Sequence, residues 1–237
     1  MKIAPFDPCR AYIAAQGRSG IPQRKKLRPV ITISREAGAG GVTIAGLIAK
    51  LLNQEVEREE APPWTVFDRN LVERVIEDHD LPKTLQRFMP EDVKPDIKDA
   101  VEELLGLHPS SWTLVQHTTQ TILNLARLGN VILVGRGANI ITARFPHAVH
   151  VRLVAPKEAR VREMESLHGM DHGAALEFVG KTDRARRRYV QRYFDTAIDD
   201  PLNYSLILNT GRIDFQTAAH LVVEAVRERT LVAWALT

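Results

Sequence analysis

The sequence is poor in the features that mark secreted, metal-rich and membrane-spanning proteins. One of its 237 residues is cysteine, Cys9, which excludes an intrachain disulfide and a cysteine-rich zinc site. No run of 18 or more apolar residues occurs, and the N-terminus lacks the apolar core of a signal peptide. Hydrophobic residues make up 44% and charged residues 26%, which is typical of a globular protein. We therefore expect a soluble, cytoplasmic protein with one main domain and no membrane partner.

The net charge of +3 is concentrated at the N-terminus. Residues 1–29 carry seven basic side chains and one acidic side chain, whereas residues 30–237 carry 25 basic and 28 acidic ones. A basic terminal segment can contact nucleic acid or anionic lipid, although such segments are more often solvated and mobile. We predict a flexible basic leader over 1–29, with at most non-specific nucleic-acid contact, followed by one domain over 30–237.

Short apolar runs alternate with helical patterns along this domain. Strands are predicted at short stretches rich in apolar and β-branched residues, at 30–33, 64–67, 131–134, 148–154 and 205–208, of which 131–134 is continuously apolar. Amphipathic spacing predicts helices that include 42–53, 112–128, 171–195 and 214–234. This alternation is typical of an α/β fold whose mainly parallel sheet is covered by helices on both faces. Because such folds bind ligands beyond the carboxyl ends of their strands, the residues that directly follow each strand are the candidate site.

A glycine-rich turn follows the first predicted strand and leads into the first helix. It reads Ser34-Arg35-Glu36-Ala37-Gly38-Ala39-Gly40-Gly41. Backbone N–H groups at a helix start bind phosphate, because the orphan donors and the helix dipole both favour negative charge. The P-loop pattern GxxxxGK[ST] fits only in part. The loop is rich in glycine, but Gly41 stands where the pattern requires the lysine. A dinucleotide-binding GxGxxG pattern fits poorly, because Thr43 stands at the third glycine, and a purely structural turn is the remaining alternative.

Five stretches, ordered along residues 30 to 235, carry a family resemblance. They are residues 31–45, Phe67-Asp68-Arg69-Asn70-Leu71, Val134-Gly135-Arg136-Gly137-Ala138, residues 183–193, and Tyr204-Ser205-Leu206-Ile207-Leu208-Asn209-Thr210. Together they resemble the cytidylate kinase-like proteins, relatives of bacterial CMP kinase. The resemblance implies a P-loop nucleoside monophosphate kinase-like fold, with a five-stranded parallel sheet flanked by helices. It also implies a helical monophosphate-binding insertion over about 70–129 and a lid over about 168–195.

Phosphoryl transfer needs cations that converge on the phosphates, and arginine provides the best geometry for them. The spacing of Arg184, Arg187 and Arg188 places them on one face of the predicted lid helix, with Arg186 pointing elsewhere. Arg136 lies between two glycines directly after a strand, where a phosphate can approach closely. We take Arg136, Arg184, Arg187 and Arg188 as candidate catalytic residues. The alternatives are a solvated basic helix and, for Arg136, a pair with a carboxylate.

The other candidates lie in the loop and at a strand end. Phosphates of ATP are expected to bind Arg35, Gly38, Ala39, Gly40, Gly41, Val42 and Thr43. Within this set, Arg35 is expected to replace part of the missing lysine charge or to pair with Glu36 or Asp68, and Thr43 is the candidate Mg²⁺ ligand. Asp68 and Arg136 are the candidates for the acceptor monophosphate, with helix capping an equal alternative for Asp68.

Two departures from the family pattern leave a second function open. Val42 stands where the relatives have an arginine, and Ala37 stands where they have an aromatic residue. The resemblance implies transfer of the γ-phosphoryl group of ATP to CMP or dCMP, with ATP and Mg²⁺ as cofactors and small nucleotides as partners. The alternative is a nucleotide-binding regulatory protein of the same fold, with little or no turnover because the loop lacks its usual cation.

Overall fold

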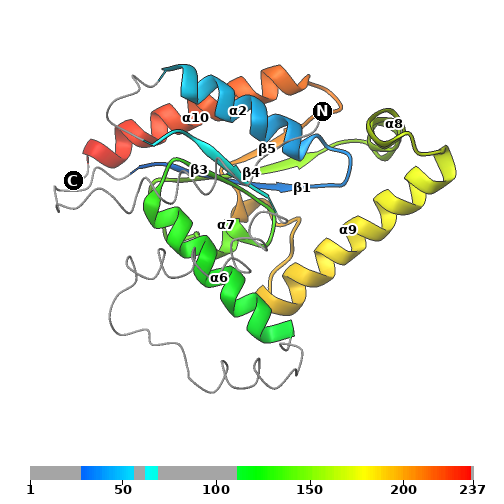
Figure 1. The fold of residues 1–237 in the computed structure, drawn as a ribbon, viewed down its shortest axis with the longest axis horizontal. Helices are drawn as coiled ribbons and strands as arrows, with labels where there is room; N and C mark the ends of the chain where they lie inside the picture. Colours follow the sequence, from blue (N-terminus) through cyan, green and yellow to red (C-terminus); the bar gives the residue numbers. More distant parts are fainter. Residues whose placement is uncertain (1–27, 56–61, 69–110, 236–237) are drawn as a thin grey trace.

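The computed structural model describes residues 28–55, 62–68 and 111–235. These residues form a sheet of five parallel strands in the order β2-β3-β1-β4-β5 (Figure 1). The strands are β1 (Val30–Arg35), β2 (Thr65–Phe67), β3 (Val131–Val134), β4 (Ala148–Val154) and β5 (Leu206–Asn209). The predicted parallel sheet is confirmed, with strand ends that differ from the predicted ones by a residue or two.

The strand order reverses at β1, which lies at the centre of the sheet. Val30 of β1 is in register with Val131 of β3 on one side and with Ala148 of β4 on the other. The chain segments that leave β1 and β3 therefore diverge at the carboxyl edge of the sheet. A reversal of this kind is the place where open α/β sheets bind their ligands.

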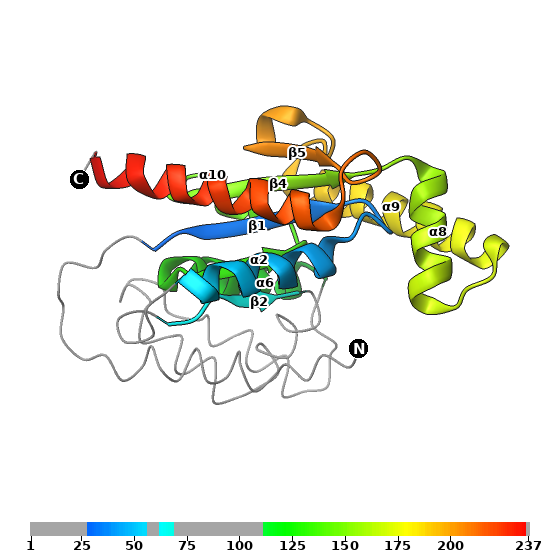
Figure 2. The same cartoon turned by 90° about the horizontal axis from the view of Figure 1, so that it is seen from above.

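Two layers of helices cover the sheet. One face is covered by α2 (Gly41–Glu55) and α10 (Phe215–Ala235), and the other by α6 (Ser111–Leu128) and the short α7 (Ala138–Ile141) (Figure 1). Beyond the carboxyl ends of the strands lie α8 (Lys157–His168) and α9 (His172–Phe194), as Figure 2 shows from above. A single 3-10 turn, η1 (Pro201–Asn203), precedes β5.

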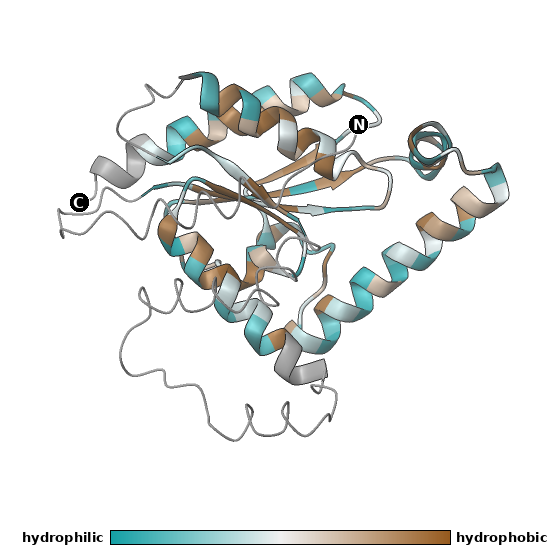
Figure 3. Cartoon of the chain, in the orientation of Figure 1, coloured by the Kyte–Doolittle hydropathy of each residue, from teal (hydrophilic) through white to brown (hydrophobic). Residues whose placement is uncertain are grey.

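Apolar residues concentrate on the strands and on the helix faces that pack against them (Figure 3). Ile31 and Ile33 of β1 pack toward Ile44 and Ile48 of α2, and all four are fully buried. Burial of one such side chain contributes about 1.5–3 kcal/mol. The sheet and α2 are thus a rigid support for the loop that joins them.

Some predictions fall on residues that the structure does not describe. They are the basic leader up to residue 27, the helix expected from about residue 70, and most of the predicted monophosphate-binding insertion. Only α6 belongs to the described part of that insertion. None of the helices over 28–55 and 111–235 combines the length and apolarity needed to span a bilayer.

A half-buried imidazole is expected to make the stability of the sheet sensitive to acid. His150 of β4 hydrogen-bonds the Thr32 hydroxyl through Nδ1 at 2.9 Å, and burial, together with the charge of Arg229, lowers the pKa of His150 to about 4. Below pH 6.5 the unfolded chain binds a proton here that the folded protein does not accept until about pH 4. The free energy of unfolding should therefore fall over this range, by up to roughly 3 kcal/mol.

Urea unfolding at pH 7 and pH 4.5 measures this loss. His150→Gln should lose less stability between the two pH values than the unchanged protein, and the exposed His220→Gln should behave like the unchanged protein. Equal losses in all three would contradict the assignment of this acid sensitivity to His150.

Candidate phosphate-binding site

The loop between β1 and α2 turns on two glycines in the left-handed region. Gly38 has φ +79° and Gly40 has φ +77°. A Cβ on Gly38 would overlap the carbonyl of Arg160, and one on Gly40 would overlap the ring of Phe215. Close packing against α8 and α10 therefore requires both glycines, whether or not a phosphate binds.

The first turn of α2 presents backbone donors toward this loop. Within the described residues, no acceptor is found for the N–H groups of Gly41, Val42 and Thr43, which open the helix. Orphan N–H groups at a helix start favour an anion. Val42 and Thr43 are exposed, whereas Ala39 and Gly41, which are also predicted to hold phosphate, are buried.

Arg35 runs from the end of β1 past the start of α2 to the turn after β3. A Cβ on Gly41 would lie 2.8 Å from Arg35 Cγ, and one on Gly135 would overlap Arg35 Nη1. Burial, followed by the charge of Arg186, lowers the pKa of Arg35 to about 9, and the charge of Asp68 acts in the opposite direction. The charged form of Arg35 is therefore disfavoured until an anion joins it.

Two more guanidinium groups act on Arg35 from neighbouring strands. Arg136 follows β3 and Arg152 lies on β4, and the charge of each lowers the pKa of Arg35. Asp68, which follows β2, acts on Arg35 in the opposite sense and raises its pKa. The charges of three arginines thus act on Arg35 at the carboxyl edge of the sheet, and two of these arginines also face carboxylates: Arg152 pairs with Asp199 at 2.7 Å, and Arg186 lies 4.0 Å from Asp183.

The turn after β3 holds Arg136 in a strained conformation. Gly135, Arg136 and Gly137 have φ values of +89°, +56° and +70°. A non-glycine residue in this region costs of order 1–2 kcal/mol and such strain clusters at functional sites. The guanidinium of Arg136 lies over the ring of Tyr189 at 5.6 Å, so α9 also fixes its position.

The loop is bonded to α8 and α9 through one buried ion cluster. Asp183 Oδ1 accepts a hydrogen bond from the Ala37 N–H at 2.8 Å, and its Oδ2 accepts one from Arg160 Nη1 at 2.6 Å. Arg160 Nη1 also donates to the Ala37 carbonyl at 3.1 Å, and Arg160 Nε lies 3.3 Å from Glu36 Oε2. Ala37 packs beside Val179 in a small apolar cluster. The loop and the two helices are thus one packed unit.

The predicted lid arginines occupy different places on α9. Arg186 lies off the face of the other three, as the spacing predicts, and its Nη1 donates to the Arg35 carbonyl at 3.1 Å. Arg187 is exposed, and its Nε donates to Asp199 Oδ2 at 3.0 Å. Arg184 and Arg188 are exposed on α9. The structure therefore brings Arg35, Arg136 and Arg186 together, and the roles of Arg184, Arg187 and Arg188 stay predictions.

Sequence reasoning missed Arg152, Asp183 and Arg160. Arg152 is buried in β4 and donates from Nη1 to Ser34 Oγ at 2.9 Å. Its signal was an arginine at an alternating position of an otherwise apolar strand. Asp183 and Arg160 gave no comparable signal, because their contacts with the loop join residues far apart in the sequence.

The glycine that faces Arg35 provides a test of how that guanidinium is held. Gly135→Ala introduces both a left-handed alanine and an overlap with Arg35 Nη1. Gly169→Ala is a matched control, because Gly169 has φ +62° and nothing lies within 4 Å of its would-be Cβ. Each should lose about 1–2 kcal/mol of unfolding free energy from the backbone. Only Gly135→Ala should also weaken nucleotide binding, by about tenfold as measured by isothermal titration calorimetry. Equal nucleotide affinities of Gly135→Ala and Gly169→Ala would contradict this position for Arg35.

The fold and this site define a nucleotide kinase-like α/β protein. It has a glycine-rich loop and converging arginines at the point where the strand order reverses. The model of the cytidylate kinase-like family matches residues 30–212, which is most of the chain. The chain belongs to the cytidylate kinase-like family.

The chain is similar to solved structures at low sequence identity. An uncharacterized protein from Eubacterium ventriosum superposes with a TM-score of 0.63 at 19% identity, over 85% of this chain and 99% of that chain. A shikimate kinase from Bacteroides thetaiotaomicron has a TM-score of 0.46 at 17% identity, over 84% of this chain and 98% of that chain.

A curated relative matches only part of the chain. Uronate isomerase from Corynebacterium glutamicum is 27% identical over 111 residues, which is 47% of this chain and 21% of the isomerase. The chain therefore spans about a fifth of the length of that relative.

Proposed function

We propose that the protein transfers the γ-phosphoryl group of ATP to CMP or dCMP. The observation that supports this most strongly is the electrostatic state of Arg35, a half-buried guanidinium whose charged form is disfavoured by Arg136, Arg152 and Arg186 and favoured by Asp68. Burying like charges together is unfavourable unless a counter-charge is present. A polyphosphate on the adjacent loop would provide that counter-charge.

The residues divide this work by their position. The N–H groups from Gly38 to Thr43 would hold the phosphates of ATP, and Arg35 would supply the cation that Gly41 and Val42 do not. Arg136 and Asp68 would face the acceptor phosphate. The exposed arginines of α9, within the lid proposed over about 168–195, would meet the transferring group: Arg184, Arg187 and Arg188.

The residues fit a magnesium ion that is bound mainly through substrate. Over the described ranges there is no group of three or more His, Cys, Asp or Glu side chains that could hold a metal. Mg²⁺ in kinase sites takes few protein ligands, because phosphates and water complete its shell. Thr43, exposed at the start of α2, would be the protein ligand. When bound, Mg²⁺ neutralises charge on the phosphates.

A coupled assay of ADP formation tests the proposal directly. The protein is incubated with ATP and Mg²⁺ and with CMP, dCMP, UMP, AMP or GMP in turn. We expect turnover with CMP or dCMP to exceed that with the other acceptors. The alternative is a regulatory nucleotide-binding protein, which the absence of a loop lysine favours. Saturable ATP binding without turnover on any acceptor would select that alternative, and the absence of both would reject both functions.

A further inference from the structure

One carboxylate joins the centre of the sheet to α9. Asp199 Oδ1 accepts a hydrogen bond from Arg152 Nη2 at 2.7 Å, and Asp199 Oδ2 accepts one from Arg187 Nε at 3.0 Å. Arg152 is 4% exposed, whereas Asp199 and Arg187 are each 53% exposed. Asp199 therefore connects a buried guanidinium of β4 with a solvent-facing guanidinium of α9.

The buried end of this connection is fixed. Arg152 is in register with Ser34 on β1 and donates to its Oγ at 2.9 Å. The Tyr204 hydroxyl donates to the carbonyl of Ile198, the residue before Asp199, at 2.6 Å, and also lies 3.3 Å from Ser34 Oγ. The segment that carries Asp199 is thus held against the last residues of β1, next to Arg35.

The exposed end leaves donors for a ligand. A guanidinium has five N–H donors in a rigid plane, and the contact with Asp199 uses the one on Nε. That contact restrains the direction of the plane, the side chain is 53% exposed, and within the described residues neither terminal nitrogen makes a hydrogen bond. The hydrogen bond and charge of Asp199 also raise the pKa of Arg187.

We propose that Asp199 is a positioning residue, which acts through Arg187 and orients its guanidinium toward the transferring phosphate. The inference rests on the proposed kinase function and extends it to a residue outside the loop and the lid. Holding a cation in one direction before the reaction removes the ordering cost from the transition state, because the side chain no longer has to be oriented there. Loss of Asp199 should therefore lower kcat more than it raises the KM for ATP.

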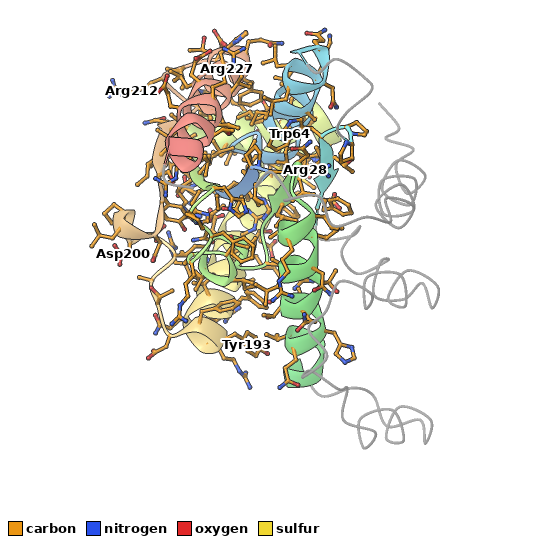
Figure 4. All side chains as sticks on the ribbon, turned by 90° about the vertical axis from the view of Figure 1, so that its left-hand side faces the viewer. Arg28, Trp64, Tyr193, Asp200, Arg212 and Arg227 are labelled. Atoms are coloured by element: carbon orange, nitrogen blue, oxygen red, sulfur yellow. The ribbon has the colours of Figure 1, made fainter. Side chains whose placement is uncertain are left out.

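A double-mutant cycle on kcat tests this role. Asp199→Asn keeps an oxygen acceptor for Arg152 and removes the charge, and we expect it to lower kcat about tenfold. Arg187→Ala should lower kcat by about 30-fold, and the double variant should be no worse than Arg187→Ala alone. Asp199→Glu should recover most of the activity. Asp200→Asn is the matched control: Asp200 accepts from the Leu202 N–H and lies on the outer side of the molecule, away from α6 (Figure 4).

Each outcome of the cycle supports or overturns the positioning role of Asp199. Additive losses in the double variant, or an equal loss in Asp200→Asn, would overturn the role of Asp199. If Asp199→Asn does not fold, the cycle is measured with Asp199→Glu, whose smaller loss of kcat should vanish in the Arg187→Ala background, and persistence there would overturn the role. If the protein without substitutions shows no turnover, that result would overturn the proposed kinase function itself.

Discussion

Replacing Arg35 by methionine is expected to lower kcat/KM for phosphoryl transfer by at least about 100-fold, or about 2.7 kcal/mol of transition-state stabilisation. Arg35 is the guanidinium on which the other charges of the site act, and it lies beside the helix start where a P-loop lysine would contribute its charge. Methionine keeps a side chain of similar length for packing and removes the positive charge. Steady-state kinetics of ADP formation measure the effect.

The same substitution should leave stability equal or increased. The charged form of Arg35 is disfavoured by burial and by three neighbouring guanidinium groups, so its removal relieves an unfavourable interaction in the protein without nucleotide. Arg35→Lys should retain more activity than Arg35→Met, and Arg144→Ala, at an exposed arginine outside the site, should change neither activity nor melting temperature. Full activity with a lowered melting temperature in Arg35→Met would assign Arg35 a structural role.

Replacing Arg160 by methionine is expected to lower the free energy of unfolding by about 3–5 kcal/mol. Arg160 is 9% exposed and lies between Asp183 and Glu36, which are 12% and 16% exposed. Its removal leaves two carboxylates with little access to water and without their main cation. It also removes the donors to the Ala37 and Ala155 carbonyls. Chemical denaturation, with the midpoint and slope compared with the unchanged protein, measures the loss.

A neighbour on the same helix provides the control for Arg160. Arg162 is exposed on α8, so Arg162→Met should change the unfolding free energy by less than about 0.5 kcal/mol. Adding Asp183→Asn to Arg160→Met should restore part of the loss, because it removes one of the uncompensated charges. A loss below about 1 kcal/mol in Arg160→Met would show that the ion cluster contributes little to the attachment of the loop.

The centre of the sheet could be predicted from sequence because β1 and β3 are buried on both faces. Val131–Val134 is a continuous apolar run and needs no knowledge of its neighbours to be recognised. The loop could be placed because its glycines directly follow such a strand. The rotation of α9 could not be predicted from spacing by itself. It depends on Ala175 and Val179 packing under the loop, and this packing is what directs Arg186 to the Arg35 carbonyl.

Contacts between residues far apart in the sequence could not be predicted, for a related reason. The pair of Ser34 and Arg152 exists only because β1 and β4 are neighbours in a particular register. A shift of one residue would turn Arg152 to the other face of the sheet. Likewise, Asp199 lies in an irregular segment before η1, where no periodicity indicates the direction of a side chain.

The bonds of Asp183 and Arg186 to the loop backbone have a consequence for how nucleotide is captured. Since α9 is attached to the loop at both Arg35 and Ala37, any approach of that helix to a bound polyphosphate must carry the loop along. We therefore expect the two to move together, with the conformational freedom of the loop lost when the chain folds. Under the proposed function, binding energy would then not be consumed in ordering the loop again, and the part of the site that holds ATP would be preorganised.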